Sequence, residues 1–418
     1  MPAARVHSAP DRATLLRTGA FAAMLATAGL PLYIHLPRFA GSELGLSLGT
    51  LGALLIALRI FDLVQDPFLG RLVDRFPVAR GGFAALAAAG LAAGFVMLFS
   101  LAPPTAPALW LALSLMLLFT AFSLATILLY GQGVALAGAG GGHFGLAGAR
   151  EAGLLAGVIL AAAAPSALAA LLGSDRAYVA FGFLLAALAL GIWAVTRPLW
   201  GPARRSIAPL SLASLRSSGA GGLLLLALLN ATPVALTSTL FLFFVEDRLA
   251  LPALAGPFLI LFFAAAGLSA PLWGALAGRI GPRASLLAGM SLAVLAFAGA
   301  VTLGPGDALA FALISAASGA ALGADMVILP ALFAAALDRA GLPAGQAFGL
   351  WAVASKLALA AAAALALPLL EIRGYTPGGP NGDGALATLT FAYAVLPCLL
   401  KLGVIALLIF QPLPGART

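Results

Sequence analysis

The stretch 56–75, IALRIFDLVQDPFLGRLVDR, places charged residues inside an apolar run. Arg59, Asp62 and Asp66 lie among leucine, isoleucine, valine and phenylalanine, and further charges follow at 71–75. An apolar run of about 20 residues is long enough to cross a lipid bilayer as a helix. The stretch therefore predicts a membrane-spanning helix that carries charge inside the bilayer.

The composition of the whole chain is typical of a protein embedded in lipid. Of its 418 residues, 62% are hydrophobic and 9% are charged, whereas a soluble domain usually has about 25% charged residues. Twelve apolar runs of spanning length predict an all-α membrane protein with twelve transmembrane helices. The predicted spans are 15–40, 46–70, 82–102, 107–136, 150–172, 177–196, 220–245, 253–278, 284–303, 307–336, 345–370 and 387–412.

Basic residues in the loops predict the orientation of these helices. Fifteen arginines fall in segments assigned to one side, and four (Arg38, Arg176, Arg248 and Arg373) fall on the other. Because basic loops stay in the cytoplasm, both termini are expected there. The chain is thus expected in the plasma membrane, or in the inner membrane of a Gram-negative bacterium. Its net charge of +8 follows from this topology and does not indicate nucleic acid as a partner.

The longest polar stretch divides the predicted spans into two sets of six. We expect an N-terminal half at 1–196, a cytoplasmic central loop at 197–219 and a C-terminal half at 220–418. Glycine and arginine follow the second span of each half, as a weak internal repeat. Two six-helix halves joined by a basic loop are the arrangement of major facilitator transporters.

Charged residues within spans are costly and indicate functional sites. Asp62 and Asp66 lie four residues apart and share one helix face, where each carboxylate raises the pKa of the other unless a cation lies between them. We therefore predict a site for Na⁺ or H⁺ at this pair, with the Gln65 amide as a further ligand. The alternative is a structural charge network that holds this helix to its neighbours.

The chain has two lysines, and both fall inside predicted spans. Lys356 is expected to contact the solute or the acidic pair, with snorkelling toward an interface as the alternative. Lys401 has no evident partner in the sequence, so a structural role is favoured, and the role of Asp325 stays open. At the predicted cytoplasmic face, we expect an ion-pair latch, formed by Asp74, Arg75 and Arg80.

The string RIFDLVQDPFLG (59–70) resembles the second-span motif of the glycoside–pentoside–hexuronide:cation symporters, the melibiose-permease-like branch of the major facilitator superfamily. The resemblance implies a coupling-cation site for Na⁺, Li⁺ or H⁺. Matching family positions assign this site to Asp62, Gln65, Asp66 and Thr120, and place Arg150 and Lys356 near the solute.

The solute site departs from that of the family's sugar carriers. No acidic residue occurs between Arg12 and Ser42, while Ser123 and Ile127 stand where the family has a sugar-binding aspartate and a stacking tryptophan. Recognition of the hydroxyl groups of a sugar requires polar side chains that converge on it and an aromatic ring that stacks on it. We therefore expect a small anionic or amphiphilic solute, with two alternatives: a sugar:cation symporter or a proton-coupled exporter of lipophilic compounds.

The sequence does not favour an enzyme. The three histidines and the single cysteine show no metal-ligand spacing, and the serines within spans have no histidine partner. No cofactor is expected besides the coupling cation, and the partners expected are the solute and the bilayer. A monomer is predicted.

Overall fold

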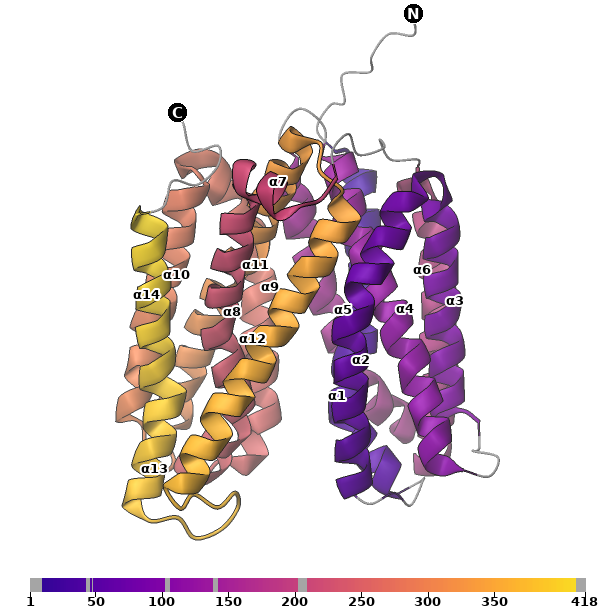
Figure 1. Cartoon of the computed structure of the whole chain (residues 1–418). Helices are drawn as coiled ribbons and strands as arrows, with labels where there is room; N and C mark the ends of the chain where they lie inside the picture. The colour runs from indigo at the N-terminus through magenta and orange to yellow at the C-terminus, as the bar shows by residue number, and fades with distance from the viewer. Residues whose placement is uncertain are drawn as a thin grey trace, which may run out of the picture. The chain divides into compact units, whose positions relative to one another are not determined.

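A computed structural model of the chain describes residues 10–42, 46, 48–101, 106–137, 142–201 and 209–410. Within these ranges the chain is almost entirely helical and contains no strand (Figure 1). It divides into two compact units. The first comprises Met1–Leu210 and Gly341–Leu350, and the second comprises Ser211–Ala340 and Trp351–Thr418.

The first unit is a bundle of long helices joined by short connections. Helix α1 packs along α5, and α3 packs against both α4 and α6. The unit also takes the first turns of α12, whose remaining residues belong to the second unit. Its elements are α1 (Arg12–Ser42), α2 (Leu48–Arg75), η1 (Pro77–Ala79), α3 (Arg80–Phe99), α4 (Pro107–Leu136), α5 (His143–Leu172), α6 (Ser174–Thr196) and η2 (Arg197–Leu199).

Helices α1 and α5 approach closely at glycine positions, where a larger side chain would not fit. A Cβ atom at Gly153 would lie 2.0 Å from the carbonyl oxygen of Gly19. Small residues permit such contacts, which hold helices together in a bilayer. The expected start of this span at residue 150 is wrong, because α5 begins two turns earlier at His143. Glycines lower the helix propensity of 143–149, but this segment lies against α1 and is helical.

The second unit has the same kind of architecture. Helix α9 packs along α11, and α8 packs against α14. Its elements are α7 (Leu212–Ser217), α8 (Ala220–Phe243), the π-helix η3 (Phe244–Arg248), η4 (Pro252–Leu254), α9 (Ala255–Ile280), α10 (Pro282–Ala298), η5 (Gly299–Thr302), α11 (Ala308–Ala340), α12 (Ala344–Ile372), α13 (Asp383–Thr390), the π-helix η6 (Phe391–Val395) and α14 (Leu396–Phe410). The last predicted span is thus a single helical run in which η6 adds a π-helical turn.

The predicted central loop contains a short helix. Residues 202–208 of this loop lie outside the described residues. After them, Ser211 caps α7: its hydroxyl accepts the Ser214 N–H at 3.1 Å, and the Ser214 hydroxyl accepts the Ser211 N–H at 2.9 Å. These reciprocal bonds satisfy backbone donors at the helix start, so the chain enters α8 through an ordered turn.

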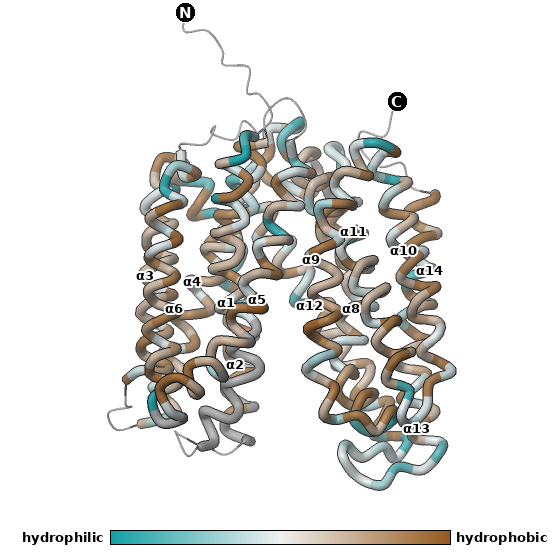
Figure 2. The backbone as a smooth tube through the Cα atoms, turned by 180° about the vertical axis from the view of Figure 1, so that it is seen from behind, coloured by the Kyte–Doolittle hydropathy of each residue, from teal (hydrophilic) through white to brown (hydrophobic). Residues whose placement is uncertain are grey.

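The helices have the length and surface expected in a bilayer. Within the described ranges, ten helices are long and apolar enough to span a membrane, and α1 and α2, with 31 and 28 residues, also have spanning length. Large apolar side chains such as Leu86, Leu268 and Leu313 are exposed on them. Hydrophobic residues predominate along the middle parts of the helices, and many of the hydrophilic residues gather toward helix ends and loops (Figure 2). The helix surfaces therefore suit contact with lipid.

Candidate functional site

Helix α2 directs polar side chains into the interior of the first unit. Asp62, Gln65 and Asp66 are 6%, 8% and 0% exposed, while Val64 and Phe68 on the same helix are exposed. Their spacing of three and four residues puts the polar side chains on one face. The face predicted to bind a cation is therefore buried, and the apolar face points outward.

Helix α4 joins α2 through hydrogen bonds to this face. The Asp62 Oδ1 atom accepts hydrogen bonds from Gln65 Nε2 at 2.8 Å and from Ser123 Oγ at 3.0 Å. The Thr120 hydroxyl donates to Gln65 Oε1 at 2.9 Å. Carboxylate, amide and hydroxyl oxygens thus meet between two packed helices, in a region where the other side chains are mostly apolar.

The structure brings together most residues predicted at the cation site. Asp62, Gln65 and Thr120 form one hydrogen-bonded network, and Asp66 lies one turn further along the same face. The side chain of Arg59 lies outside the described residues. In the described part of the chain, no three histidine, cysteine, aspartate or glutamate side chains cluster as metal ligands. A cation at this place would therefore have two carboxylates at most, completed by neutral oxygens.

Two residues predicted at the solute site have different surroundings. Ser123 belongs to the Asp62 network rather than to a separate patch. Ile127 is buried within the apolar core of the first unit. Their contact with a solute stays a prediction.

Arg150 lies in a buried aromatic and acidic environment. Its guanidinium stacks on the ring of Tyr130, with the Arg150 Cζ atom 3.9 Å from the ring centroid. Both Arg150 Nε and Arg150 Nη2 lie 2.8 Å from Glu151 Oε1. The Tyr130 ring in turn contacts Phe348, in the part of α12 that belongs to the first unit. Sequence reasoning left Glu151 out of the site, although its position next to Arg150 was a signal for this ion pair.

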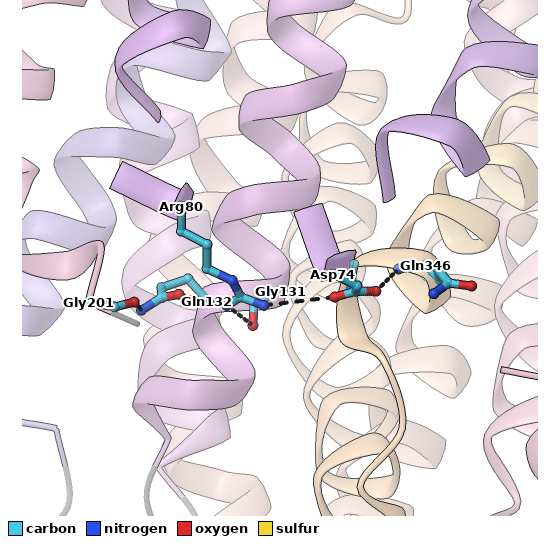
Figure 3. A network of polar contacts seen from close by, with 7 residues as sticks. Asp74, Arg80, Gly131, Gln132, Gly201 and Gln346 are labelled. Carbon is cyan, nitrogen blue, oxygen red and sulfur yellow. Dashed lines mark hydrogen bonds and ion pairs between the residues drawn. The ribbon is translucent and has the colours of Figure 1, made fainter. Parts of the chain in front are cut away.

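The end of α2 binds the beginning of α12 (Figure 3). Asp74 accepts backbone N–H groups of Gly345 at 3.0 Å and Gln346 at 2.6 Å. A carboxylate at a helix N-terminus satisfies its free donors and complements its dipole. The two backbones also lie close together, since a Cβ at Gly70 would lie 2.4 Å from the Gly345 carbonyl oxygen.

The predicted latch contains Arg80 and Asp74 in a different arrangement from the one expected. Arg80 lies 3.9 Å from Asp74 and donates to Gln132 Oε1 at 2.7 Å, while Gln132 donates to the Leu199 carbonyl oxygen at 2.7 Å. Arg75 instead lies over the ring of Phe76 and is exposed, and no ion pair is recorded for it in the described ranges. The latch thus consists mainly of bonds to the α12 backbone, which sequence patterns do not reveal.

The two lysines lie in the second unit. Lys356 is half-buried on α12, and its expected contact with the acidic pair of the first unit stays a prediction. The expectation that Lys401 lacks a partner is wrong: its Nζ lies 2.5 Å from Asp325 Oδ2 and 2.6 Å from Asn230 Oδ1. Isolated charges in apolar spans were a signal that each needs a partner, but they do not say which residues meet.

Comparisons with known proteins agree with the fold. A point variant of the Escherichia coli fucose:proton symporter has 14% identity and a TM-score of 0.66, and the match covers 96% of this chain and 98% of that one. A bacterial homologue of the iron transporter ferroportin, in an outward-facing state, has 15% identity and a TM-score of 0.68, with coverage of 94% and 99%. At these identities the likeness establishes the fold alone.

The sequence comparisons establish the family. No curated protein sequence matches the chain. The profile of the family described as MFS/sugar transport protein matches residues 16–415, which is nearly the whole chain. The match confirms the predicted major facilitator fold, and it indicates membrane transport rather than enzymatic catalysis. The chain therefore belongs to the melibiose-permease-like branch of the major facilitator superfamily.

Proposed function

We propose that this transporter is a symporter that couples entry of a small solute to Na⁺ or H⁺, with the cation held at Asp62 and Asp66. The observation that carries the proposal is the buried network in which Asp62, Gln65, Thr120 and Ser123 meet. Carboxylate, amide and hydroxyl oxygens are suitable ligands for a hard cation. A carboxylate pair can alternatively share a proton.

Coupling follows from the cost of buried charge. Two carboxylates inside a bilayer are unfavourable until a cation neutralises part of their charge. Cation binding would therefore stabilise a conformation that can bind solute and then change access. The Asp74 contact with the start of α12 would be broken and remade during this cycle.

The proposed solute is a small anionic or amphiphilic compound. The Arg150 guanidinium supplies positive charge, and the rings of Tyr130 and Phe348 supply apolar surface beside it. An anionic group would share Arg150 with Glu151, so binding is expected to be of moderate strength. Lys356 is proposed as a second contact with the anionic group or with the acidic pair.

The proposed orientation places both termini in the cytoplasm. It rests on the excess of arginine in the loops assigned to that side. The membrane is the plasma membrane, or the inner membrane of a Gram-negative bacterium, and the working unit is a monomer.

Solute uptake into proteoliposomes tests this function. Purified protein is reconstituted, Na⁺ and H⁺ gradients are imposed separately, and uptake of labelled sugars, carboxylates and lysophospholipids is measured. We expect one gradient to drive accumulation of an anionic or amphiphilic compound above its equilibrium level. Accumulation that ignores both gradients would reject the coupling, and saturable uptake of a simple sugar would reject the solute class.

Transport direction separates this proposal from the alternative of proton-coupled export. In inside-out vesicles the lumen corresponds to the cell exterior. A proton-coupled exporter therefore accumulates lipophilic compounds in the lumen when the lumen is acidified. A symporter moves its solute in the same direction as the cation. The apolar surroundings of Ile127 suit either substrate, so direction and not affinity is the deciding measurement.

A further inference from the structure

A second polar cluster, the one that contains Lys401, lies buried inside the second unit. Asn230 on α8, Asp325 on α11 and Lys401 on α14 are 4%, 7% and 4% exposed. The Lys401 ammonium lies 2.5 Å from Asp325 Oδ2 and 2.6 Å from Asn230 Oδ1. Helix α8 packs against both α11 and α14 within the unit, so the fold brings the three side chains together.

The cluster has hydrogen-bonding capacity left over. Asp325 Oδ1 is buried and has no hydrogen-bond partner in the part of the chain that the structure describes. The two recorded bonds of Lys401 use two of its three N–H donors. A buried ion pair is stabilising only when its remaining donors and acceptors are also satisfied. The geometry therefore offers one strong acceptor and one donor to a further group.

Asp325 and Lys401 also line a cavity with mostly apolar walls. Its volume is about 60 Å³. Phe262, Phe297 and Leu322 supply apolar surface, while Ser318 and Thr237 complete its polar part. The hydroxyls of Ser318 and Thr237 already donate to carbonyl oxygens of their own helices, Ile314 and Val234. The unsatisfied acceptor of Asp325 is therefore the distinctive polar feature of the cavity.

We propose that this cavity is a binding site for a small, mainly apolar molecule that carries one hydroxyl group. The hydroxyl donates to Asp325 Oδ1 and accepts from the third N–H of Lys401, while the apolar body lies against the phenylalanine and leucine walls. A hydroxyl is both donor and acceptor, so it matches both open positions.

Charge selects the hydroxyl over ionised groups. The Asp325–Lys401 pair is already neutral as a whole, so an ammonium or a carboxylate would leave one uncompensated charge in an apolar cavity. The same argument distinguishes this site from the Arg150 region, where an anionic group is proposed. The inference concerns binding alone and does not depend on cation coupling at Asp62 and Asp66.

Cys398 provides a reporter inside the site. It is the only cysteine of the chain, it is half-buried, and it lines the same cavity as Lys401. Occupation of the cavity should therefore shield its thiol. The rate of its modification by methyl methanethiosulfonate can be followed as an increase in the intact mass of the purified protein, since no other residue of the chain carries a thiol.

The test compares 1-butanol with its isomer methyl propyl ether. The two have the same atoms and nearly the same size, but only the alcohol has an O–H donor. We expect 1-butanol to protect Cys398 at concentrations about tenfold lower than the ether, because the ether leaves Asp325 Oδ1 unsatisfied. Equal protection by both compounds, or protection by neither, would overturn the proposal. The second result would mean that water alone occupies the site.

Paired variants identify the residues responsible. Asp325→Leu combined with Lys401→Met removes both charges together, so neither is left uncompensated in the interior. This double variant should lose the preference for the alcohol, whereas Asp383→Asn, an exposed change in the same unit, should keep it. A preference that persists in the double variant would reject the assignment.

Thermal unfolding supplies a readout that does not need the thiol. A ligand that binds only the folded state raises the melting temperature with concentration. We expect 1-butanol to raise the melting temperature of the wild-type protein relative to the ether, and to lose that advantage in the double variant. An identical response of wild type and double variant to both compounds contradicts the site even if Cys398 reacts slowly.

Discussion

Asp62 accepts hydrogen bonds from a neighbour on its own helix and from Ser123 on α4. Its carboxylate is therefore held in place before any cation arrives, which reduces the free energy spent on ordering ligands. Carboxylate-to-amide substitution keeps the shape of this side chain and removes its charge. At the scale of single residues, comparing the amide variant with the wild type therefore separates a coupling role of Asp62 from a packing role.

Asp62→Asn is expected to abolish cation-driven uptake while the protein stays folded. Loss of one of two carboxylates weakens the attraction for Na⁺ and removes one of the two proton acceptors that would share a proton. We expect cation-dependent accumulation in proteoliposomes to fall at least about tenfold, with an unchanged elution profile in size-exclusion chromatography. Asp307→Asn, in an exposed turn of the second unit, is the control. Cation-dependent uptake that survives in both Asp62→Asn and Asp66→Asn would reject the assignment.

Ser123→Ala should have a smaller effect with a different signature. The substitution removes one of the hydrogen bonds recorded for Asp62 Oδ1 but keeps the carboxylate, so the cation would bind with less preorganisation. We expect the cation concentration for half-maximal uptake to rise about three- to tenfold, for about 1 kcal/mol of lost interaction. Uptake kinetics over a range of cation concentrations measure this, with Ser114→Ala on the same helix as control. An unchanged cation dependence would place Ser123 outside the coupling site.

The residues of α2 were predictable because helical spacing decides which side chains share a face. Asp62, Gln65 and Asp66 could be grouped from the sequence alone. The pairing of Lys401 with Asp325 could not, because it joins residues on separate helices, and the packing of those helices is set by tertiary contacts that a single sequence does not encode as a local pattern.

At the scale of elements, the loop after α12 is bound to η3, the π-helical turn that follows α8. The Tyr375 hydroxyl donates to Asp247 on η3, and the Gly378 N–H donates to the same carboxylate at 3.3 Å. Burial, together with the neighbouring Asp247 carboxylate, raises the pKa of Tyr375 above its usual value of 10.0. The hydroxyl thus stays protonated at neutral pH, and its stabilising contribution is lost only as pH rises above 10.

Tyr375→Phe should therefore lower the free energy of unfolding below pH 10. Removing a hydrogen bond to a charged acceptor costs about 1.5–3 kcal/mol, which thermal denaturation in detergent can measure. Tyr393→Phe is the matched control, because Tyr393 is also buried but its hydroxyl has no hydrogen bond within the described residues. Equal destabilisation by the two substitutions would contradict the role given to the Asp247 contact.

Element boundaries were predicted less well than element number. The apolar runs identified every long helix, because length and hydropathy determine whether a segment can span a bilayer. The start of α5 at His143 was missed because glycine content suggested a loop, whereas contact with α1 maintains the helix. Capping by Ser211 and the π-helical turns also depend on local geometry that hydropathy does not report.

At the scale of the whole molecule, α12 contributes to both units. Its first residues belong to the first unit and the rest to the second. Asp74 binds this helix at its N-terminus through the backbone of Gly345 and Gln346. This connection was predicted in part: Asp74, Arg75 and Arg80 were expected to form a latch, but the contact of Asp74 with a helix end was not expected.

Asp74→Asn is expected to loosen the start of α12. An amide is a weaker acceptor than a carboxylate and lacks the charge that complements the helix dipole. We expect backbone amide hydrogen exchange in 341–350 to become about tenfold faster, for about 1.4 kcal/mol of lost stabilisation. Mass spectrometry of peptides from this segment measures the rate, and Asp383→Asn is the control. Unchanged exchange would show that the carboxylate charge does not hold the helix.

The 29 residues of α12 also make it a mechanical lever. At a rise of 1.5 Å per residue the helix is about 43 Å long, so a tilt of about 10° displaces its far end by about 7 Å. The Asp74 carboxylate binds one end of this helix, where a small change becomes a large displacement at the other end. We therefore expect substitutions at Gly345 or Gln346 to change the rate of the transport cycle more than the affinity for the cation or the solute.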